Sequence, residues 1–276
     1  RSPIITPKTL VIVVSQSGET ADTLAALREA KRNGARVLAI TNVVGSSVAR
    51  EADDVIITLA GPEIAVASTK AYTSQLIAFY LLGLHMAQVL GTKDEAYIAH
   101  VLAAMQSLPE QVERILAQGE TIKTVAESIA KHHNLFFIGR GVDYAVALEG
   151  SLKLKEISYI HSEAYAAGEL KHGTLALIET GTPVIALLTQ PDLTEKMISN
   201  IEEVRARGAE VFYVASRSLQ DSALHAQHVF WVPDVHPYLM PVVVAVPLQV
   251  LAYYAAVNRG NDVDKPRNLA KSVTVE

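Results

Sequence analysis

Near its start the chain reads Leu10-Val-Ile-Val-Val-Ser-Gln-Ser-Gly-Glu-Thr20. A valine-rich apolar run without polar alternation is typical of a strand in a parallel sheet that is covered on both faces. The polar turn that follows leads into a helix from about Glu19, and apolar residues recur there at helical spacing until Asn33-Gly34 ends it. Strand, loop and helix together predict an α/β fold.

The same pattern occurs twice, 174 positions apart. The aligned pairs include Ser15-Gln16 with Thr189-Gln190, Gly34 with Gly208, Val55 with Val229, and Gln75 with Gln249. One unbroken offset predicts two equivalent modules. About 40 residues precede the second module and indicate a strand (Leu135–Ile138), a long helix and a return segment. Their counterparts would fall before residue 1, so we expect the first module to lack its opening at the N-terminus.

Each module is predicted to be a flavodoxin-like three-layer αβα structure, a parallel sheet with helices on both faces. The expected strands are Leu10–Val14, Val37–Ile40 and Val55–Leu59, then Val184–Leu188, Val211–Val214 and Val229–Val232, and the closing helices are Tyr72–Val89 and Val244–Asn258. The predicted domains are residues 1–91 and 133–259, with linking helices at 92–132 and a polar tail at 260–276.

The composition excludes several classes of function. The 276 residues carry a net charge of −5 and no long basic run, which argues against a nucleic-acid partner. The apolar stretches Leu76–Leu84 and Val242–Val250 are too short for a membrane span, which needs about 20 residues. No cysteine is present, which excludes disulfides and a cysteine nucleophile and fits a reducing compartment. We therefore expect a cytoplasmic globular protein with no membrane or nucleic-acid partner.

The loop Ser15–Thr20 is a candidate phosphate site, because unpaired N–H groups and the positive end of a helix attract anions at the carboxyl end of a parallel strand. Its neutral donors are the hydroxyls of Ser15, Ser17 and Thr20 and the amide of Gln16. In the second copy Pro191 removes a donor and Asp192 repels an anion, so phosphate binding is predicted for the first copy. The alternative is that Ser17 merely caps the helix.

A second candidate site lies on the helix after Gly141, where Glu149, Lys153 and Glu156 share one stripe at i, i+4 and i+7. The following segment, His161–Gly173, concentrates titratable groups beside two glycines. His172 is a candidate acid/base there because of its neighbours. The alternative for the stripe is a solvated face with ordinary ion pairs.

Metal and cofactor signals are weak. No spacing of His, Asp and Glu matches a metal site, and Gly139-Arg-Gly141 is only a fragment of a dinucleotide-binding motif. We expect no metal and no cofactor.

Five motifs together carry a resemblance to a known family. They are Ser15–Thr20, Ala67–Lys70, Leu152–His161, Glu163–Gly173 and Pro266–Glu276. The whole chain resembles the isomerase half of the glutamine:fructose-6-phosphate aminotransferases, or glucosamine-6-phosphate synthases, which is a tandem pair of sugar isomerase (SIS) domains. SIS loops occur in many sugar-phosphate proteins, whereas Glu169-Leu-Lys-His-Gly173 and the tail Lys271–Glu276 are narrow signals.

The resemblance implies a role for each candidate residue. Ser15, Gln16, Ser17 and Thr20 would hold the phosphate of fructose 6-phosphate, with Val66 and Ser68 near the sugar. Glu156 would move a proton between C1 and C2, supported by Lys153, and Lys271 would contact the open-chain sugar or form an imine with it. His172 would open the sugar ring, entering the site of the partner subunit in a homodimer.

Three departures from the family are visible. The complete enzyme carries a glutaminase domain with a cysteine nucleophile, which this sequence lacks, so we expect no release of ammonia from glutamine. The family's first SIS domain opens with a strand and a Gly-Thr-Ser loop that touch the sugar, and these would fall before residue 1. Thr174 stands where the family usually has proline.

The leading hypothesis is an isomerase portion that binds fructose 6-phosphate. It would convert this sugar to glucose 6-phosphate, or to glucosamine 6-phosphate with ammonia from elsewhere. One alternative is a non-catalytic SIS sugar-phosphate sensor, which would have no use for Glu156, His172 and Lys271 together. Another is a deaminase or ketose/aldose isomerase without a glutaminase domain.

Overall fold

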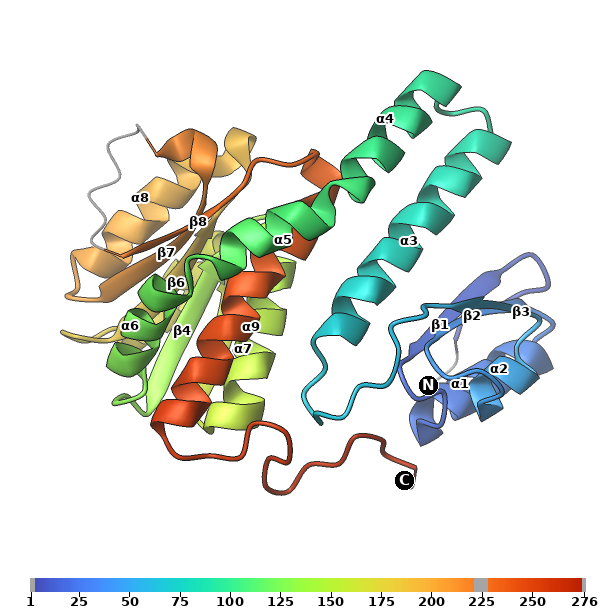
Figure 1. The fold of residues 1–276 in the computed structure, drawn as a ribbon, viewed down its shortest axis with the longest axis horizontal. Helices are drawn as coiled ribbons and strands as arrows, with labels where there is room; N and C mark the ends of the chain where they lie inside the picture. Colours follow the sequence, from blue (N-terminus) through green and yellow to red (C-terminus); the bar gives the residue numbers. More distant parts are fainter. Residues whose placement is uncertain (1–2, 221–227, 275–276) are drawn as a thin grey trace. The chain divides into compact units, whose positions relative to one another are not determined.

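The computed structural model describes residues 3–220 and 228–274 (Figure 1). The chain divides into two compact units. Unit 1 comprises Arg1–Lys93 and Arg267–Glu276, and unit 2 comprises Asp94–Pro266. The helices that the sequence analysis treated as linking therefore belong to unit 2, and the end of the polar tail belongs to unit 1.

Unit 1 is built on a three-stranded parallel sheet in the order β1-β2-β3. Its elements are β1 (Leu10–Ser15), α1 (Ala21–Arg32), β2 (Arg36–Thr41), α2 (Ser47–Glu51), β3 (Asp54–Ile57) and α3 (Lys70–Val89). Gly34 follows α1 with a φ of +79°, a conformation that glycine adopts at low cost. Leu27 of α1 and Val37 of β2 are fully buried in the core between helices and sheet.

Unit 2 contains a five-stranded parallel sheet in the order β5-β4-β6-β7-β8. Its strands are β4 (Asn134–Gly139), β5 (His161–Ala166), β6 (Pro183–Leu188), β7 (Glu210–Ser216) and β8 (Val229–Val232). Its α-helices are α4 (Glu95–Gln106), α5 (Leu108–Leu116), α6 (Gly119–Ile129), α7 (Val142–Ser158), α8 (Thr194–Arg205) and α9 (Met240–Asn258), and the short 3-10 helices η1 (Ala167–His172) and η2 (Thr174–Leu177) follow β5.

Helices cover both faces of this second sheet. Figure 1 shows α6, α7 and α9 on one side and α8 on the other. Alternation along β4 explains the two faces, since Phe136 and Ile138 share a core cluster with α8, whereas Phe137 lies against Gly150 of α7. The predicted three-layer αβα arrangement is therefore confirmed for unit 2.

The 174-residue repeat is visible in the structure. Strands β1, β2 and β3 and helix α1 correspond in order to β6, β7, β8 and α8, with boundaries that agree to within one residue. For example, adding 174 to Arg36 at the start of β2 gives Glu210 at the start of β7. The prediction of tandem α/β modules with parallel sheets is confirmed.

The first module is the smaller one. Among residues 3–93 and 267–274, unit 1 has no counterpart of β4, α7 and β5. Strand β1 is therefore an edge strand on the side where β6 pairs with β4. This free edge explains why Leu10 of β1 is 44% exposed, while all six residues of β6 are buried.

Helix α9 belongs to the core of unit 2. Within the described part of the chain, Pro237–Asn258 is the one helical segment that is long and apolar enough to span a membrane. However, 67% of its apolar window is buried in the protein, where α9 packs against α6 and α7. The predicted closing helix, Val244–Asn258, thus begins four residues earlier in the structure, at Met240, and ends at the same residue.

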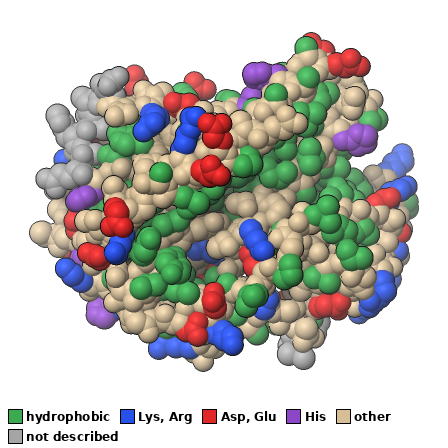
Figure 2. Space-filling view, viewed as in Figure 1, with side chains coloured by type: hydrophobic (Ala, Val, Ile, Leu, Met, Phe, Trp, Pro, Cys, Tyr) green, Lys and Arg blue, Asp and Glu red, His purple; other side chains and the backbone are tan. Residues whose placement is uncertain are grey.

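Helix α3 of unit 1 presents apolar side chains to solvent. Phe79, Leu81, Met86 and Val89 are 40% to 70% exposed, and exposed hydrophobic side chains appear in green in Figure 2. Several large exposed apolar groups on one helix are typical of a surface that packs against another protein.

Candidate functional site

The loop Ser15–Thr20 lies at the carboxyl end of β1 and leads into α1. Ser15 Oγ accepts a hydrogen bond from Gly18 N at 3.0 Å and lies 3.1 Å from Thr20 Oγ1. Ser17 Oγ accepts a hydrogen bond from Glu19 N at 3.2 Å. The hydroxyls thus brace the loop, and the structure brings all four residues predicted to bind phosphate into one turn.

The same loop is fixed to the start of α2. Gly18 has a φ of +68°, and a Cβ there would lie 2.0 Å from Ser46 Oγ. Gly18 O accepts a hydrogen bond from Val48 N at 2.9 Å, and the Glu19 carboxylate accepts one from Ser47 N at 2.8 Å. Hydrogen bonding at Ser47 lowers the pKa of Glu19. Only glycine fits at position 18, because both the backbone conformation and the close approach exclude a side chain.

The tail of the chain crosses this loop within unit 1. Ser272 Oγ lies 3.0 Å from Ser17 Oγ, and Val273 O accepts a hydrogen bond from Ala21 N at 3.1 Å. The tail therefore takes one of the N–H groups at the start of α1 that a helix leaves unpaired.

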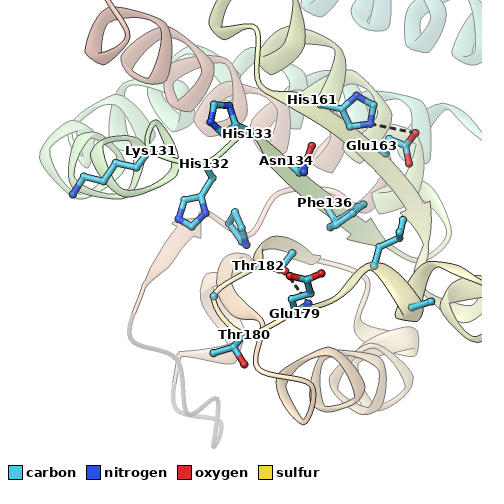
Figure 3. A pocket seen from close by; sticks show the side chains of 14 residues that line it. Lys131, His132, His133, Asn134, Phe136, His161, Glu163, Glu179, Thr180 and Thr182 are labelled. Atoms are coloured by element: carbon cyan, nitrogen blue, oxygen red, sulfur yellow. Dashed lines mark hydrogen bonds and ion pairs between the residues drawn. The ribbon is translucent and has the colours of Figure 1, made fainter.

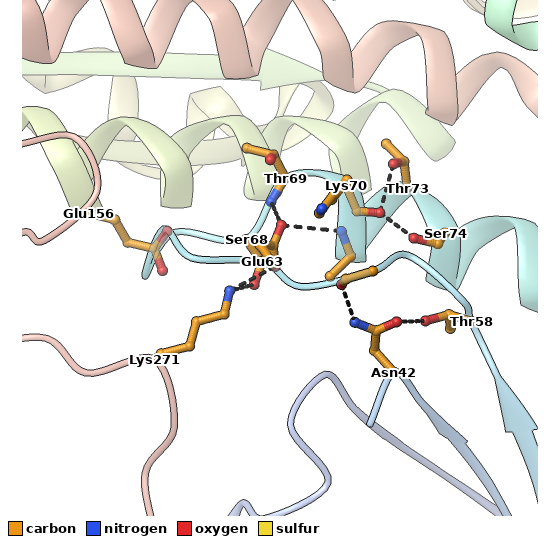
Figure 4. Close-up of polar contacts among 12 residues, drawn as sticks. Asn42, Thr58, Glu63, Ser68, Thr69, Lys70, Thr73, Ser74, Glu156 and Lys271 are labelled. Atoms are coloured by element: carbon orange, nitrogen blue, oxygen red, sulfur yellow. Dashed lines mark hydrogen bonds and ion pairs between the residues drawn. The ribbon is translucent and has the colours of Figure 1, made fainter. Parts of the chain in front are cut away.

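These anchors place Lys271 on the segment before α3. Lys271 Nζ donates to Glu63 Oε2 at 2.7 Å and to Ser68 Oγ at 2.9 Å (Figure 4). Val66 and Ser68, the predicted sugar-binding residues, lie on this segment and are partly exposed. Seven of the ten predicted site residues are thus in unit 1.

The corresponding loop of unit 2, at Thr189 and Gln190, is hydrogen-bonded to a carboxylate of the same unit. Asp143, in the first turn of α7, is only 3% exposed. Its carboxylate accepts hydrogen bonds from Thr189 N at 2.8 Å, from Thr189 Oγ1, and from Gln190 Nε2 at 3.4 Å. Burial raises the pKa of Asp143, and these hydrogen bonds partly offset that effect. The donors that Thr189 and Gln190 could offer to an anion are therefore already engaged.

The remaining predicted acid/base groups are in unit 2. Lys153 Nζ lies 2.6 Å from Glu156 Oε2 and 3.6 Å from Glu149 Oε1. The three side chains are only 5%, 21% and 13% exposed, respectively. Apart from Lys153, neither of these two carboxylate oxygens has a polar partner in the described part of the chain, so each keeps lone pairs for another donor. The alternative of a solvated helix face is wrong, because the ion pairs are buried.

Glu149 is the group in this cluster with the most perturbed acidity. Burial raises the pKa of Glu149 to about 7, Lys153 opposes the increase, and the negative charge of Glu156 adds to it. Glu149 was predicted to lie on the stripe, but no role was predicted for it. Its proximity to Lys153 makes it a third titratable member of the cluster.

Glu149→Gln should change how stability depends on pH. The folded pKa of Glu149 is about 7, above its ordinary value of 4.5, so its contribution to stability is present below about 4.5 and lost as the pH rises through about 7. The loss is on the order of 3 kcal/mol, less whatever Lys153 and Glu156 redistribute. Urea unfolding at pH 5 and pH 7.5 should show the variant gaining stability relative to the parent chain at the higher pH. An unchanged difference between the two pH values would contradict this.

His172 makes no bond to the lysine–carboxylate cluster in the described part of the chain. It ends η1, its side chain is 75% exposed, and its Nε2 lies 3.7 Å from Glu169 Oε2. Across residues 3–220 and 228–274, no hydrogen bond or ion pair joins His172 to Glu149, Lys153 or Glu156. The chain by itself therefore does not bond this histidine to the other acid/base groups.

A cavity of about 650 Å³ lies elsewhere in unit 2, at the amino ends of β4, β5 and β6 (Figure 3). Its lining includes His132, His133, His161 and Glu163, and His161 Nε2 lies 3.6 Å from Glu163 Oε1. None of the ten predicted site residues lines it. Ligands of parallel α/β sheets usually bind at the opposite, carboxyl ends of the strands.

Comparison with known proteins identifies the architecture. A family model described as "SIS domain" matches residues 2–85 and 128–259. The chain belongs to the SIS family. The SIS chain is also 60% identical over 276 residues to the glutamine–fructose-6-phosphate aminotransferase (isomerizing) of Clostridium acetobutylicum, covering 100% of this chain and 45% of that protein. It spans about half the length of the curated relatives that it matches.

Solved structures give the same result. The C-terminal domain of glucosamine-fructose-6-phosphate aminotransferase from Francisella tularensis matches with a TM-score of 0.93 and 38% identity, covering 96% of the SIS chain and 75% of that chain. Glucosamine-6-phosphate deaminase from Thermotoga maritima matches with a TM-score of 0.76 and 26% identity. This match covers 99% of the SIS chain and 77% of the deaminase chain. The SIS chain is therefore homologous to the isomerase part of glutamine–fructose-6-phosphate aminotransferase.

Two residues at the site of this SIS chain were missed from sequence. Glu63 pairs with Lys271 across 208 positions, and Asp143 bonds Thr189 across 46. A signal for Glu63 existed, since an acidic residue shortly before a predicted helix start often accepts N–H groups there. No local pattern connects Asp143 to its partner.

Proposed function

We propose that the SIS chain binds fructose 6-phosphate and moves a proton between C1 and C2, giving glucose 6-phosphate. The observation that carries the proposal is the buried Glu149–Lys153–Glu156 cluster in a member of the SIS family. Burying a cationic side chain between two carboxylates costs free energy of folding. A protein that only bound the phosphate of a ligand would not need such a cluster.

In this proposal the Ser15–Thr20 loop binds the phosphate through its hydroxyls, the Gln16 amide and the start of α1. Phosphate binding belongs to this copy because Asp143 already engages the second one. Val66 and Ser68 contact the sugar, and Lys271 contacts its open-chain form or forms an imine with it.

Glu156 acts as the base that takes the proton from C1 and returns it to C2. Lys153, 2.6 Å away, compensates the negative charge of Glu156 and so supports it. His172 opens the ring as a general acid/base, which its exposed position leaves it free to do in the site of a second copy. The homodimer that this requires has support in the exposed apolar side chains of α3.

In a longer protein that also carries a glutaminase domain, ammonia released from glutamine would make glucosamine 6-phosphate the product. The names of the relatives, glutamine–fructose-6-phosphate aminotransferase, support this assignment. We also propose a cytoplasmic location, because a chain without cysteine fits a reducing compartment.

A thermal-shift titration tests the binding step. Fructose 6-phosphate at about 100 times its Kd should stabilise the chain by about 2.7 kcal/mol, which raises Tm by about 5 °C or more. Fructose, which lacks the phosphate, is the matched control and should leave Tm unchanged. If millimolar fructose 6-phosphate has no more effect than fructose, the assignment of the phosphate loop fails.

The alternatives predict different chemistry. A non-catalytic sensor would bind fructose 6-phosphate without turnover, and a deaminase would release ammonia from glucosamine 6-phosphate. The likeness to the Thermotoga maritima deaminase supports the second alternative only at the level of fold and 26% identity.

A further inference from the structure

Glu63 is a buried carboxylate at the start of α3 that has no role in the proposed chemistry. Its side chain is only 4% exposed. It accepts hydrogen bonds from Thr69 N at 2.8 Å, from Ala71 N at 3.3 Å and from Lys271 Nζ at 2.7 Å. All four residues belong to unit 1.

The charge of Glu63 is stabilised by these contacts. Burial alone would raise the pKa of Glu63, but the hydrogen bonds from Lys271 and from the two amides together lower it below the ordinary value. The carboxylate is therefore ionised at neutral pH. A buried anion of this kind stabilises the positive end of α3 and attracts a cation.

The two backbone contacts also close the segment Glu63–Thr69 on itself. Because Glu63 accepts from the amides of Thr69 and Ala71, it holds both ends of the short loop that carries Val66 and Ser68. Lys271 bonds to this loop twice, at Glu63 and at Ser68 (Figure 4). A single carboxylate thus joins the proposed sugar-contacting loop to the proposed sugar-contacting lysine.

We propose that Glu63 is a positioning residue, which fixes the place of the Lys271 side chain beside the sugar-contacting loop. This inference rests on the proposed function, since it assumes that Lys271 contacts the open-chain sugar. Glu63 touches no substrate atom in this scheme. It acts through Lys271 and through the shape of the loop.

The test compares Glu63→Gln with Glu63→Asp in the full chain. Glutamine keeps the shape and loses the charge, whereas aspartate keeps the charge with a shorter reach. Losing one charge-assisted contact to Lys271 should lower kcat for fructose 6-phosphate isomerisation about 10- to 100-fold, with KM changed by less than about threefold. Glu63→Asp should recover part of the loss. Glu29→Gln, which alters a surface pair with Arg32, is the matched control and should change neither constant.

A second readout does not depend on turnover. The rate at which an acylating reagent labels Lys271 can be measured by peptide mass spectrometry relative to exposed Lys8. Because the carboxylate holds Lys271 Nζ against the loop and the Lys271 side chain is only 24% exposed, Glu63→Gln should release it and increase that ratio about threefold or more, and Glu63→Asp should increase it less. Circular dichroism confirms that each variant is folded.

The outcomes separate the two proposals. If the parent chain shows no isomerisation, the proposed function fails, and the labelling ratio still tests the contact between Glu63 and Lys271. If the parent chain is active and Glu63→Gln leaves kcat unchanged, the positioning role is wrong whatever the labelling shows. An unchanged labelling ratio likewise overturns it.

Discussion

Replacement of Glu156 with glutamine is expected to slow isomerisation of fructose 6-phosphate about 100- to 10 000-fold, the range that a lost general base accounts for. Glutamine has the same shape as glutamate but cannot accept the proton from C1. Fructose 6-phosphate should still raise Tm as it does for the parent chain, because the proposed phosphate donors are elsewhere. The coupled assay for glucose 6-phosphate measures the rate, and a thermal-shift titration measures binding.

The structure also defines what else this substitution changes. Lys153 is 5% exposed and loses its nearest counter-charge, but Glu149 remains 3.6 Å away. We therefore expect a folded protein. Glu195→Gln, an exposed change on α8, is the matched control and should keep the parental rate. If Glu156→Gln retains more than about a tenth of the rate, the assignment of Glu156 as the base is wrong.

The second large effect is expected at Gly18. A Cβ at this position would lie 2.0 Å from Ser46 Oγ and 2.5 Å from Ser46 Cβ, and the residue has a φ of +68°. Gly18→Ala must therefore displace the loop or the start of α2, at a cost of about 1–3 kcal/mol for overpacking in addition to the cost of a positive φ. Misplacing even one phosphate donor should weaken fructose 6-phosphate binding about 10- to 100-fold.

Gly45→Ala provides the matched control for Gly18→Ala. Gly45 has a similar φ of +75°, but a Cβ there would meet nothing within 4 Å. This variant should carry only the conformational cost of about 1 kcal/mol and should bind the sugar normally. Calorimetric titration distinguishes the two variants. Equal affinities for fructose 6-phosphate in both would mean that the loop geometry does not matter for binding.

Much of the fold could be predicted from the sequence, because the determinants are local and repeated. The apolar runs around Val13 and Val37 indicated buried parallel strands, and the 174-residue offset placed their counterparts β6 and β7. Gly34 indicated the end of α1 because its positive φ is a local requirement. The division into units was harder to predict, since the tail from Arg267 shows no core periodicity and yet belongs to unit 1.

The site was predicted less completely, because its contacts join distant residues. The stripe Glu149–Glu156 could be found, since helical spacing brings these residues together. Its burial could not be found, because it depends on the packing of the whole unit. Glu63 was missed because its partner in the site, Lys271, lies 208 positions later in the sequence. Asp143 was missed because only the fold brings it to Thr189.

The asymmetry between the two modules follows from these few residues. The first copy keeps Ser15, Ser17 and Thr20 in a loop braced by its own hydroxyls, and the second engages the donors of Thr189 and Gln190 with Asp143. One phosphate site per chain is the consequence for the proposed function. The acid/base cluster is on α7 of unit 2, whose counterpart is absent from the described residues of unit 1.

The most direct measurement is whether the full chain converts fructose 6-phosphate to glucose 6-phosphate, followed by proton NMR without glutamine or ammonia. Glucose 6-phosphate is expected to appear with the parent chain, and Glu156→Gln should form it at least about 100 times more slowly. The contradictory result is a parent chain that is stabilised by fructose 6-phosphate but forms no glucose 6-phosphate, which would make it a sugar-phosphate sensor.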